Sequence, residues 1–375
     1  MKKVVIAIDS FKGCLPSVEA GKAAAEGIRS VYPECEVICL PIADGGEGML
    51  DVLIMATNGQ EVPISAHDPL MRWRNTYYGI SENGETAFIE MASISGLPLV
   101  PPERRNPMLT TTYGTGEIIR DALERGCRNF IIGIGGSATN DAGLGMLQAL
   151  GFRFSDKEGK KVGTGCGEVL IKVAHIDSTC VHPALNSCRF TVACDVQNPF
   201  YGPEGAAYVF APQKGADREM VEALDAGLQN FAEVIRHTTG KDISHHPGAG
   251  AAGGMGGSLL AFLNAELKPG IQLMLEALDF SNKIKSADLI ITGEGKADRQ
   301  TLMGKVPSGI LAEARKQNIP VILLAGNIED SDELQQAGFE GVFSVNPPFI
   351  SLEEAMRPEV ARKNIQQTVE SICKK

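Results

Sequence analysis

The hydrophobic pattern alternates between strand and helix at both ends of the chain. Short apolar runs predict buried strands, and apolar residues at helical spacing predict helices between them. This regular strand–helix order is typical of a parallel α/β sheet. The predicted strands are Val4–Ile8, Glu36–Leu40, Leu289–Thr292, Val321–Ala325 and Gly341–Val345. The predicted helices are Val18–Val31, Glu47–Ala56, Ser308–Lys316 and Glu359–Cys373.

The pattern changes in the middle of the chain. Three short strands at Gln60–Ser65, Arg74–Ile80 and Thr86–Met91 are joined by turns such as Asn83-Gly84, which predicts an antiparallel meander. Buried strands and amphipathic helices follow without strict alternation, so this part is interpreted as mixed α/β. They are the strands Phe130–Ile134 and Phe190–Ala193 and the helices Gly116–Arg125, Ala142–Leu150 and Arg218–His237.

The length of 375 residues agrees with two domains, since typical domains hold roughly 100–200 residues. We expect residues 1–62 and 285–375 to form a discontinuous, Rossmann-like parallel-sheet domain. Residues 63–284 are then an inserted mixed α/β domain.

Composition narrows the class of partner. The net charge is −11 and no run of Lys or Arg exceeds two residues, so we expect neither nucleic acid nor a membrane as partner. Five apolar residues between Lys3 and Asp9 are too few for a signal peptide. The nine cysteines form no CxxC pair, so we expect neither disulfides nor a structural zinc site. We therefore expect a reducing, cytoplasmic location.

Polar loops rich in glycine follow the predicted strands, where ligands bind in α/β sheets. The first loop carries Asp9, Ser10 and Lys12, an acid and a lysine that can hold a magnesium ion and an anionic group, or simply form a solvated turn. The second loop carries Asp44, Gly45, Gly46 and Glu47. Asp44 there is either the cap of the next helix or part of a ligand site.

The loop after Phe130–Ile134 has the strongest anion-binding pattern. Glycine leaves backbone N–H groups open to an anion, and neighbouring hydroxyls add donors. The chain has no GK[ST] sequence, so this is not a Walker A loop, and Ala138 stands where the dinucleotide fingerprint needs its third glycine. The candidate residues are Gly135, Gly136, Ser137, Thr139, Asn140 and Asp141.

Three further segments complete the candidate set. Asp195 leaves the end of an apolar strand, and Lys214 follows in a second polar turn. Gly248–Gly257 holds six glycines in ten residues, including Gly253 and Gly254, and is either a hinge or a phosphate cradle. Beyond Leu289–Thr292, the acids Glu294 and Asp298 suit contacts to a metal ion.

Backbone donors, carboxylates and isolated lysines together favour phosphoryl transfer, whose chemistry is mostly positioning and charge neutralisation. The chain lacks a GxSxG motif, and its six histidines lie outside these loops, which disfavours nucleophilic hydrolysis. A sugar-acid binding or sensor protein and a dehydrogenase remain alternatives at this point.

The motifs resemble those of the bacterial glycerate kinases that form 2-phosphoglycerate. The matching strings appear in family order over almost the whole chain. They are DSFKG (9–13), PIADGGEG (41–48), GIGGSATND (133–141), CDVQNP (194–199), PQKGA (212–216), GAGAAGGMG (248–256) and ITGEGKADRQT (291–301).

The resemblance implies ATP as phosphoryl donor, Mg²⁺ as cofactor and D-glycerate as acceptor. It favours transfer to the 2-hydroxyl over the 3-hydroxyl, in a cleft between two different α/β domains, and leaves a homo-oligomer open. On this basis we expect four groups of site residues. Catalysis is assigned to Asp195, Asp44 and Lys12, and metal binding to Asp195, Glu294 and Asp298. Nucleotide binding is assigned to Gly135, Gly136, Ser137, Thr139, Asn140, Asp141, Lys214, Gly253 and Gly254. Substrate binding is assigned to Asp9, Ser10, Lys12, Gly45, Gly46 and Glu47.

Overall fold

The chain folds into two α/β units, one of which contains both ends of the sequence. The computed structural model describes residues 1–46 and 48–374. Residues 1–44 and 271–375 form the first unit, called here the terminal unit, and residues 45–270 form the central unit. The sequence pattern had placed the two boundaries between these units at 62/63 and 284/285.

The terminal unit is built on a parallel sheet of five strands in the order β13-β12-β11-β1-β2. Its strands are β1 (Lys3–Ile8), β2 (Glu36–Cys39), β11 (Leu289–Ala297), β12 (Val321–Ile328) and β13 (Gly341–Ser344). Its helices are α1 (Ser17–Val31), α10 (Phe280–Lys283), α11 (Val306–Arg315), α12 (Ser331–Gln336), α13 (Leu352–Ala355) and α14 (Pro358–Cys373), with α9 (Gly270–Ala277) beginning at the boundary.

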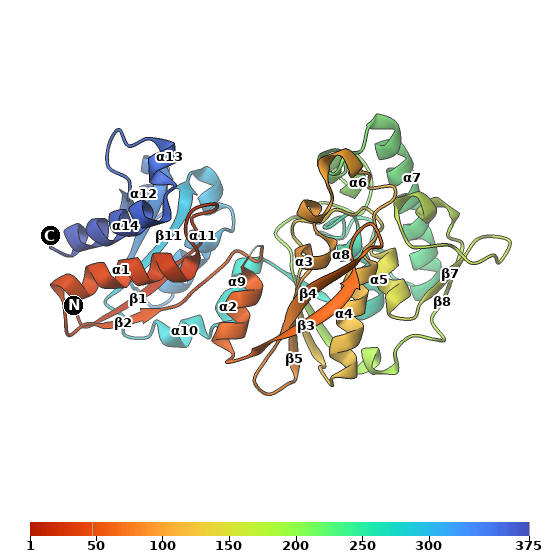
Figure 1. Ribbon diagram of the computed structural model, residues 1–375, viewed down its shortest axis with the longest axis horizontal. Helices are drawn as coiled ribbons and strands as arrows, with labels where there is room; N and C mark the ends of the chain where they lie inside the picture. Colours follow the sequence, from red (N-terminus) through yellow and green to blue (C-terminus); the bar gives the residue numbers. More distant parts are fainter. Residues whose placement is uncertain (47, 375) are drawn as a thin grey trace. The chain divides into compact units, whose positions relative to one another are not determined.

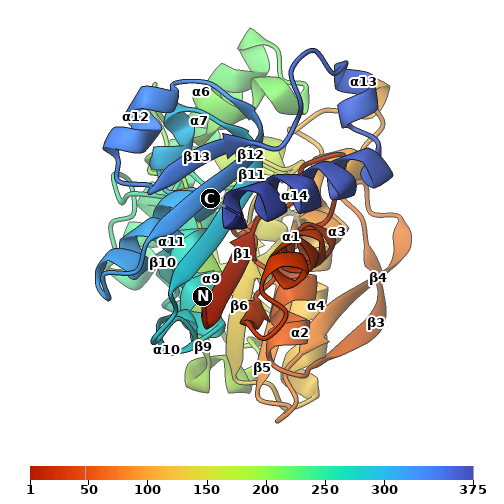
Figure 2. The same ribbon diagram turned by 90° about the vertical axis from the view of Figure 1, so that its left-hand side faces the viewer.

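Helices α1 and α14 lie side by side on one face of this sheet (Figures 1 and 2). Small residues on α1 allow the close approach. A Cβ on Gly27 would lie 2.5 Å from the carbonyl oxygen of Gln366 in α14. Ile28 and Ile365 are fully buried in the same apolar cluster as Ile6 of β1. The first and last helices of the sequence therefore cover the first strand together.

The central unit has a mixed sheet of six strands in the order β10-β9-β6-β5-β4-β3. The first four run parallel, and β4 and β3 continue as an antiparallel meander. Its strands are β3 (Gln60–His67), β4 (Trp73–Ile80), β5 (Thr86–Glu90), β6 (Asn129–Gly133), β9 (Arg189–Ala193) and β10 (Glu266–Lys268), with a separate pair β7 (Arg153–Ser155) and β8 (His175–Asp177). Its helices are α2 (Met49–Ala56), α3 (Ala92–Ser95), α4 (Tyr113–Glu124), α5 (Leu144–Ala149), α6 (Ala206–Phe210), α7 (Arg218–Thr239) and α8 (Met255–Leu263).

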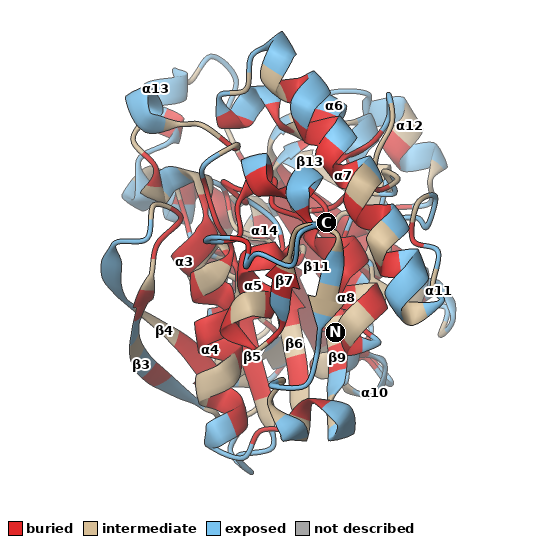
Figure 3. Ribbon diagram, turned by 90° about the vertical axis from the view of Figure 1, so that its right-hand side faces the viewer, coloured by how far each residue is buried: buried red, intermediate tan, exposed pale blue. Residues whose placement is uncertain are grey.

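The core of the central unit lies between its sheet and the covering helices. Phe130 on β6 and Phe190 on β9 stack with ring centroids 4.6 Å apart, and both are buried. Figure 3 shows mostly buried residues along β5 and α4. Burying aromatic and aliphatic side chains on both sides of β6 and β9 explains why these two strands have near-continuous apolar sequences.

The structure confirms the fold class predicted from the sequence, a parallel-sheet domain split by an inserted mixed α/β domain. One element differs in extent. The sequence pattern ended the strand before Gly293, whereas β11 continues to Ala297 because β12 pairs with it as far as Ile328. Glycine at 293 permits this pairing, since a Cβ there would lie 2.4 Å from the carbonyl oxygen of Leu324.

Within the described part of the chain, no helix combines the length and the apolar character that crossing a membrane requires.

Candidate active site

Four strands of the central unit end together at one edge of its sheet. Glu90, the last residue of β5, pairs with Gly133 of β6, and Gly133 pairs with Ala193 of β9. Lys268 at the end of β10 pairs with Ala193 in turn. The carboxyl edge of parallel strands is where α/β proteins bind ligands, so the loops beyond these residues are the place to look for a site.

A hollow of about 370 Å³ opens beside this edge. Its described lining residues are almost all without a polar side chain. Among them, Glu90 is the only ionisable side chain and Ser93 the only hydroxyl. The lining residues are Gly45, Gly46, Glu90, Ala92, Ser93, Pro98, Gly133, Gly135 and Gly136. The hollow therefore joins residues that the sequence assigned to the acceptor, at 45 and 46, with residues assigned to the nucleotide, at 135 and 136.

Different physical reasons explain why glycine is present at each position around this hollow. Gly45 has φ +91°, and a Cβ there would lie 2.6 Å from the Cα of Gly270, so only glycine fits. Gly133 packs in the same way against Met49, with 2.9 Å from a built Cβ to its Cε. Gly135 differs, because the nearest atom to a Cβ there is the Cα of Gly46 at 4.0 Å. A side chain at 135 would project into open space, so packing against the described protein does not explain the glycine at this position.

Glu90 was not predicted from the sequence. Its Oε1 accepts a hydrogen bond of 2.8 Å from the backbone N–H of Leu50, in the first turn of α2. Ser93 Oγ donates to the backbone carbonyl of Glu90 at 2.9 Å. The sequence did contain a signal for Glu90, because an acidic residue stands at the end of a buried strand here, as Asp9 and Asp195 stand just beyond the ends of β1 and β9.

Lys214 supports the 135–141 loop from inside the protein. Its side chain is 2% exposed, and Nζ donates to Ser137 Oγ at 2.8 Å and to the carbonyl oxygen of Thr139 at 2.6 Å. Burial lowers the pKa of Lys214 to about 7, and the nearby charge of Asp141 opposes that shift. The ammonium group therefore holds the loop in shape and contacts it from beneath.

The second half of the loop is internal. Asp141 is completely buried and accepts hydrogen bonds from Thr112 N and Oγ1 at 2.8 and 2.7 Å and from Gly143 N and Gly145 N, both at 3.2 Å. Burial raises the pKa of Asp141, and the hydrogen bonds from Thr112 oppose the shift. Its carboxylate thus ties the loop to the start of α4.

Thr139 and Asn140 are equally buried. Among the buried side-chain atoms of the described residues, Thr139 Oγ1 and both amide atoms of Asn140 have no hydrogen-bond partner. Buried polar groups without partners are costly, so these three atoms stand out in a loop whose other buried polar side chains are hydrogen-bonded. Direct nucleotide contact by Thr139, Asn140 and Asp141 stays a prediction, and Gly135 and Gly136 are the exposed part of the loop.

The glycine-rich segment before α8 packs against the same loop. A Cβ on Gly253 would lie 2.1 Å from the carbonyl oxygen of Thr139, and one on Gly254 would lie 2.9 Å from Leu228 Cδ2. The carbonyl of Gly253 accepts a hydrogen bond from Ala142 N at 3.0 Å. Close packing on protein thus accounts for these glycines, and phosphate contact by Gly253 and Gly254 stays a prediction.

Asp195 lies just beyond the end of β9 and is exposed. Its Oδ1 accepts a hydrogen bond of 2.8 Å from Gly270 N, the first residue of α9. A carboxylate at a helix N-terminus is favoured by the helix dipole. The structure therefore gives Asp195 an anchoring contact, beside which its predicted catalytic and metal-binding roles remain untested.

A separate charged cluster lies in the terminal unit, around the end of β1. Lys12 Nζ lies 3.4 Å from Asp44 Oδ2, and Ser10 N donates to Asp9 Oδ1 at 2.7 Å. Burial raises the pKa of Asp9 to about 7, with repulsion from Asp44 as the next cause. Asp44 raises the pKa of Lys12 in return. This cluster contains the predicted substrate-binding residues of the first loop.

Glu294 and Asp298 lie in the same unit. Glu294 sits on β11, where Oε1 accepts a hydrogen bond from Thr301 Oγ1 at 2.5 Å and Oε2 lies 3.7 Å from Lys305 Nζ. Burial raises the pKa of Glu294. Asp298 caps the short 3₁₀ turn Arg299–Leu302, with Oδ1 accepting from Gln300 N at 2.9 Å. Both carboxylates thus already have structural partners.

Across residues 1–46 and 48–374, the structure shows no set of three or more His, Cys, Asp or Glu side chains placed to hold a metal ion. Mg²⁺ in phosphoryl-transfer sites usually binds one or two carboxylates, water and the substrate phosphates instead of a full protein cage. Glu294 and Asp298 are oxygen donors of that kind. Glu47, predicted to bind substrate, lies outside the described residues.

The comparisons with known proteins agree with one another. The family model described as the glycerate kinase family matches residues 4–375. The chain is 46% identical over 372 residues to a glycerate kinase of Bacillus subtilis, covering 99% of this chain and 97% of that protein. It is 47% identical over 356 residues to the glycerate 2-kinase of Escherichia coli, covering 95% of this chain and 93% of that protein.

A solved structure gives the same likeness in three dimensions. The crystal structure of a Salmonella typhimurium protein assigned as glycerate kinase 2 matches with a TM-score of 0.91 at 44% sequence identity. The match covers 100% of this chain and 97% of that one.

Proposed function

This chain belongs to the glycerate kinase family, and we propose that it transfers the γ-phosphoryl group of ATP to the 2-hydroxyl of D-glycerate. The product is then 2-phospho-D-glycerate. The relative from Escherichia coli, a glycerate 2-kinase, supports the 2-position, and the family supports a nucleotide as donor.

One observation of the structure carries the proposal. Gly45 and Gly46, assigned to the acceptor, line the same hollow as Gly135 and Gly136, assigned to the nucleotide phosphates. Phosphoryl transfer requires the acceptor hydroxyl and the terminal phosphate to meet in one place. A hollow walled by glycine leaves backbone N–H groups close to both.

Within the central unit, the backbone of Gly135 and Gly136 binds phosphate oxygens, with Ser137 as a neighbouring donor. Lys214 acts on this step through the loop, because its ammonium group holds Ser137 and the carbonyl of Thr139 in place. The same loop and the segment packed against it carry the other residues predicted to bind the nucleotide, which are Thr139, Asn140, Asp141, Gly253 and Gly254.

Within the terminal unit, Lys12, Asp9 and Ser10 bind D-glycerate or the transferring phosphate. Asp195 of the central unit, or Glu294 or Asp298 of the terminal unit, would hold Mg²⁺, which would neutralise the phosphate charge. Asp195 or Asp44 accepts the proton of the acceptor hydroxyl. A weak base is sufficient, since the hydroxyl proton leaves late in a loose transition state.

The test is a coupled assay of ATP consumption with D-glycerate, followed by NMR of the product. We expect magnesium-dependent turnover and a phosphorus–proton coupling to the single hydrogen on C2. Coupling to the two hydrogens on C3 would identify the 3-phosphate and overturn the assigned position. ATP consumption that does not depend on D-glycerate would overturn the acceptor.

A further inference from the structure

We propose that Glu90 recognises the hydroxyl groups of the acceptor and so determines substrate specificity, an inference that rests on the proposed function. Glu90 ends β5 at the carboxyl edge of the central sheet and lines the glycine-walled hollow. Glu90 is not among the catalytic, metal-binding or substrate-binding residues expected from the sequence.

The lining of the hollow leaves few side chains that can select a ligand. Seven of its nine described lining residues are glycine, alanine or proline, which offer only backbone groups and carbon. Backbone N–H groups bind anionic oxygens well, whereas a carboxylate accepts a hydrogen bond from a hydroxyl and none from a hydrogen on carbon. Among the described lining residues, only Glu90 and Ser93 have polar side chains, and Glu90 is the carboxylate.

Glu90 is held in a defined position. The hydrogen bond of 2.8 Å from Leu50 N fixes Oε1 at the N-terminal turn of α2, where the helix dipole favours negative charge. Ser93 Oγ ties down the backbone carbonyl of the same residue at 2.9 Å. A carboxylate fixed at both its backbone and its side chain is pre-organised for binding, because little side-chain freedom remains to be lost.

The chemistry of a carboxylate selects the orientation of the acceptor. An ionised carboxylate only accepts hydrogen bonds, so it binds hydroxyl donors and repels the carboxylate of D-glycerate and the oxygens of phosphate. The hydroxyl-bearing end of D-glycerate therefore points to Glu90, and its carboxylate points to the backbone N–H groups of the glycines that line the hollow. Losing a hydrogen bond to a charged group costs about tenfold to a hundredfold in affinity.

The experiment compares Glu90→Gln with wild type, using ligands that each lack one hydroxyl. Glutamine keeps the size of the side chain and an oxygen that can accept from Leu50 N, but it has no charge. We expect the KM for D-glycerate to rise about tenfold to a hundredfold while the KM for ATP changes less than about twofold. D-lactate and 3-hydroxypropionate serve as competing ligands. The preference of wild type for D-glycerate over both should shrink by a similar factor in the variant.

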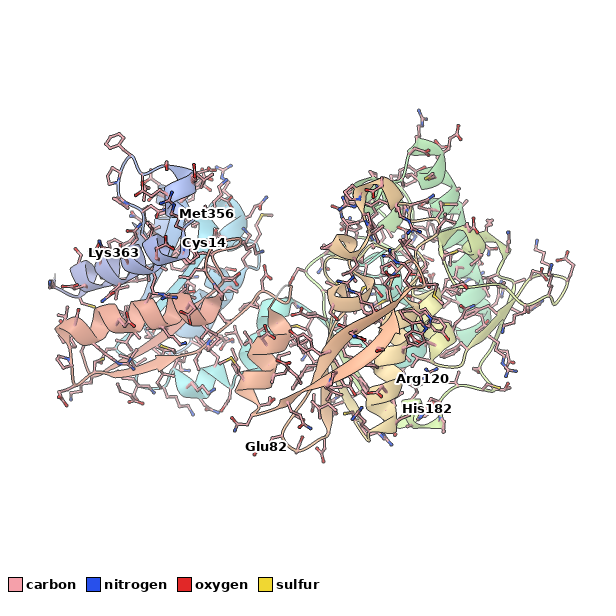
Figure 4. The ribbon with its side chains drawn as sticks, in the orientation of Figure 1. Cys14, Glu82, Arg120, His182, Met356 and Lys363 are labelled. Atoms are coloured by element: carbon pink, nitrogen blue, oxygen red, sulfur yellow. The ribbon has the colours of Figure 1, made fainter. Side chains whose placement is uncertain are left out.

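Glu82→Gln is the matched control. Glu82 is exposed at the turn between β4 and β5, labelled in Figure 4, at the other end of β5 from Glu90. The same chemical change there should leave both KM values and the preference for D-glycerate as in wild type.

The outcomes separate the two proposals. If wild type does not phosphorylate D-glycerate, the proposed function and this inference fall together. If wild type is active and Glu90→Gln keeps the KM for D-glycerate and the full preference over both analogues, only the role of Glu90 is overturned.

If Glu90→Gln does not fold, wild type alone still decides. Propionate, which lacks both hydroxyls, should then compete at least about tenfold more weakly than D-glycerate. Equal competition by propionate would show that no hydroxyl is recognised and would overturn the inference.

Discussion

Lys214 and Thr139 are joined by a hydrogen bond of 2.6 Å from the ammonium group to the backbone carbonyl, although 75 positions separate them in the sequence. The same ammonium group donates to Ser137 Oγ. A buried cation therefore determines the shape of the loop whose exposed part, Gly135 and Gly136, faces the hollow.

Lys214→Met should lower kcat/KM for ATP by about 10–100-fold, because the loop loses the group that positions it. Steady-state kinetics with varied ATP would measure this. Lys157→Met, at an exposed lysine of the same unit, is the control and should leave kcat/KM unchanged. Wild-type kinetics in Lys214→Met would remove Lys214 from the positioning of the loop.

The same substitution should change how stability depends on pH. The folded-state pKa of Lys214 is lowered to about 7 by burial, so between that pH and the ordinary 10.5 the unfolded chain binds a proton that the folded protein does not. The stability of wild type relative to Lys214→Met should therefore increase with pH, by about 2–3 kcal/mol between about pH 7 and 9. Urea unfolding of both proteins at several pH values would measure the difference. A constant difference would contradict the buried, titrating lysine.

Asp9→Asn should stabilise the protein at neutral and alkaline pH. Burial and repulsion from Asp44 raise the folded-state pKa of Asp9 from an ordinary 3.8 to about 7, so the folded protein binds more protons than the unfolded chain in that window. Wild type then loses stability as the pH rises through the window. The variant should gain about 2–4 kcal/mol over wild type from about pH 4 to pH 8.

Chemical unfolding without magnesium or substrate checks this prediction. Asp332→Asn, at an exposed aspartate of the terminal unit, should show no such trend. A variant that tracks wild type at every pH would exclude a raised pKa at Asp9.

Asp195→Asn should lower kcat by about 10²–10⁴-fold while changing the free energy of unfolding by less than about 0.5 kcal/mol. The small effect on stability is expected because Asp195 is exposed and asparagine keeps an oxygen that can accept from Gly270 N. Turnover and thermal unfolding of the same preparation would measure both quantities. Near-normal turnover would exclude Asp195 both as base and as metal ligand.

Gly135→Ala should raise KM for ATP or D-glycerate about 10–100-fold, because the new methyl group enters the open space that faces Gly46. Its effect on folding should be small, since no atom lies closer than 4.0 Å to the added Cβ. Gly163→Ala is the control, at an exposed position where nothing lies within 4 Å. Unchanged kinetics in Gly135→Ala would mean that the hollow at this point holds no ligand.

Local sequence patterns were sufficient for most strands and helices. Apolar runs such as Val4–Ile8 and Phe130–Ile134 predicted buried strands within one residue of β1 and β6. The exceptions are elements whose partners lie far away in the sequence. The last residues of β11 are polar and glycine-rich, and they are a strand only because β12 pairs with them.

The site shows the same division. A charged or glycine-bearing loop after a buried strand is visible in the sequence, and this pattern made Asp9, Gly135 and Asp195 candidates for the site. The directions of the side chains were not visible. Asp141 is turned inward to Thr112, and Lys214 is buried beneath the loop, because each is bound by a segment that no local pattern connects to it.

The sequence by itself determined the α/β class, the interruption of a parallel-sheet unit by a mixed one, the strand-end loops and the resemblance to glycerate kinases. Only the tertiary structure decided that Glu90 shares a hollow with Gly45 and Gly135, and that several polar loop residues serve the fold. The physical reason is that burial patterns repeat over a few neighbouring residues, whereas a polar group is positioned by hydrogen bonds to whichever distant strand or loop the fold brings beside it.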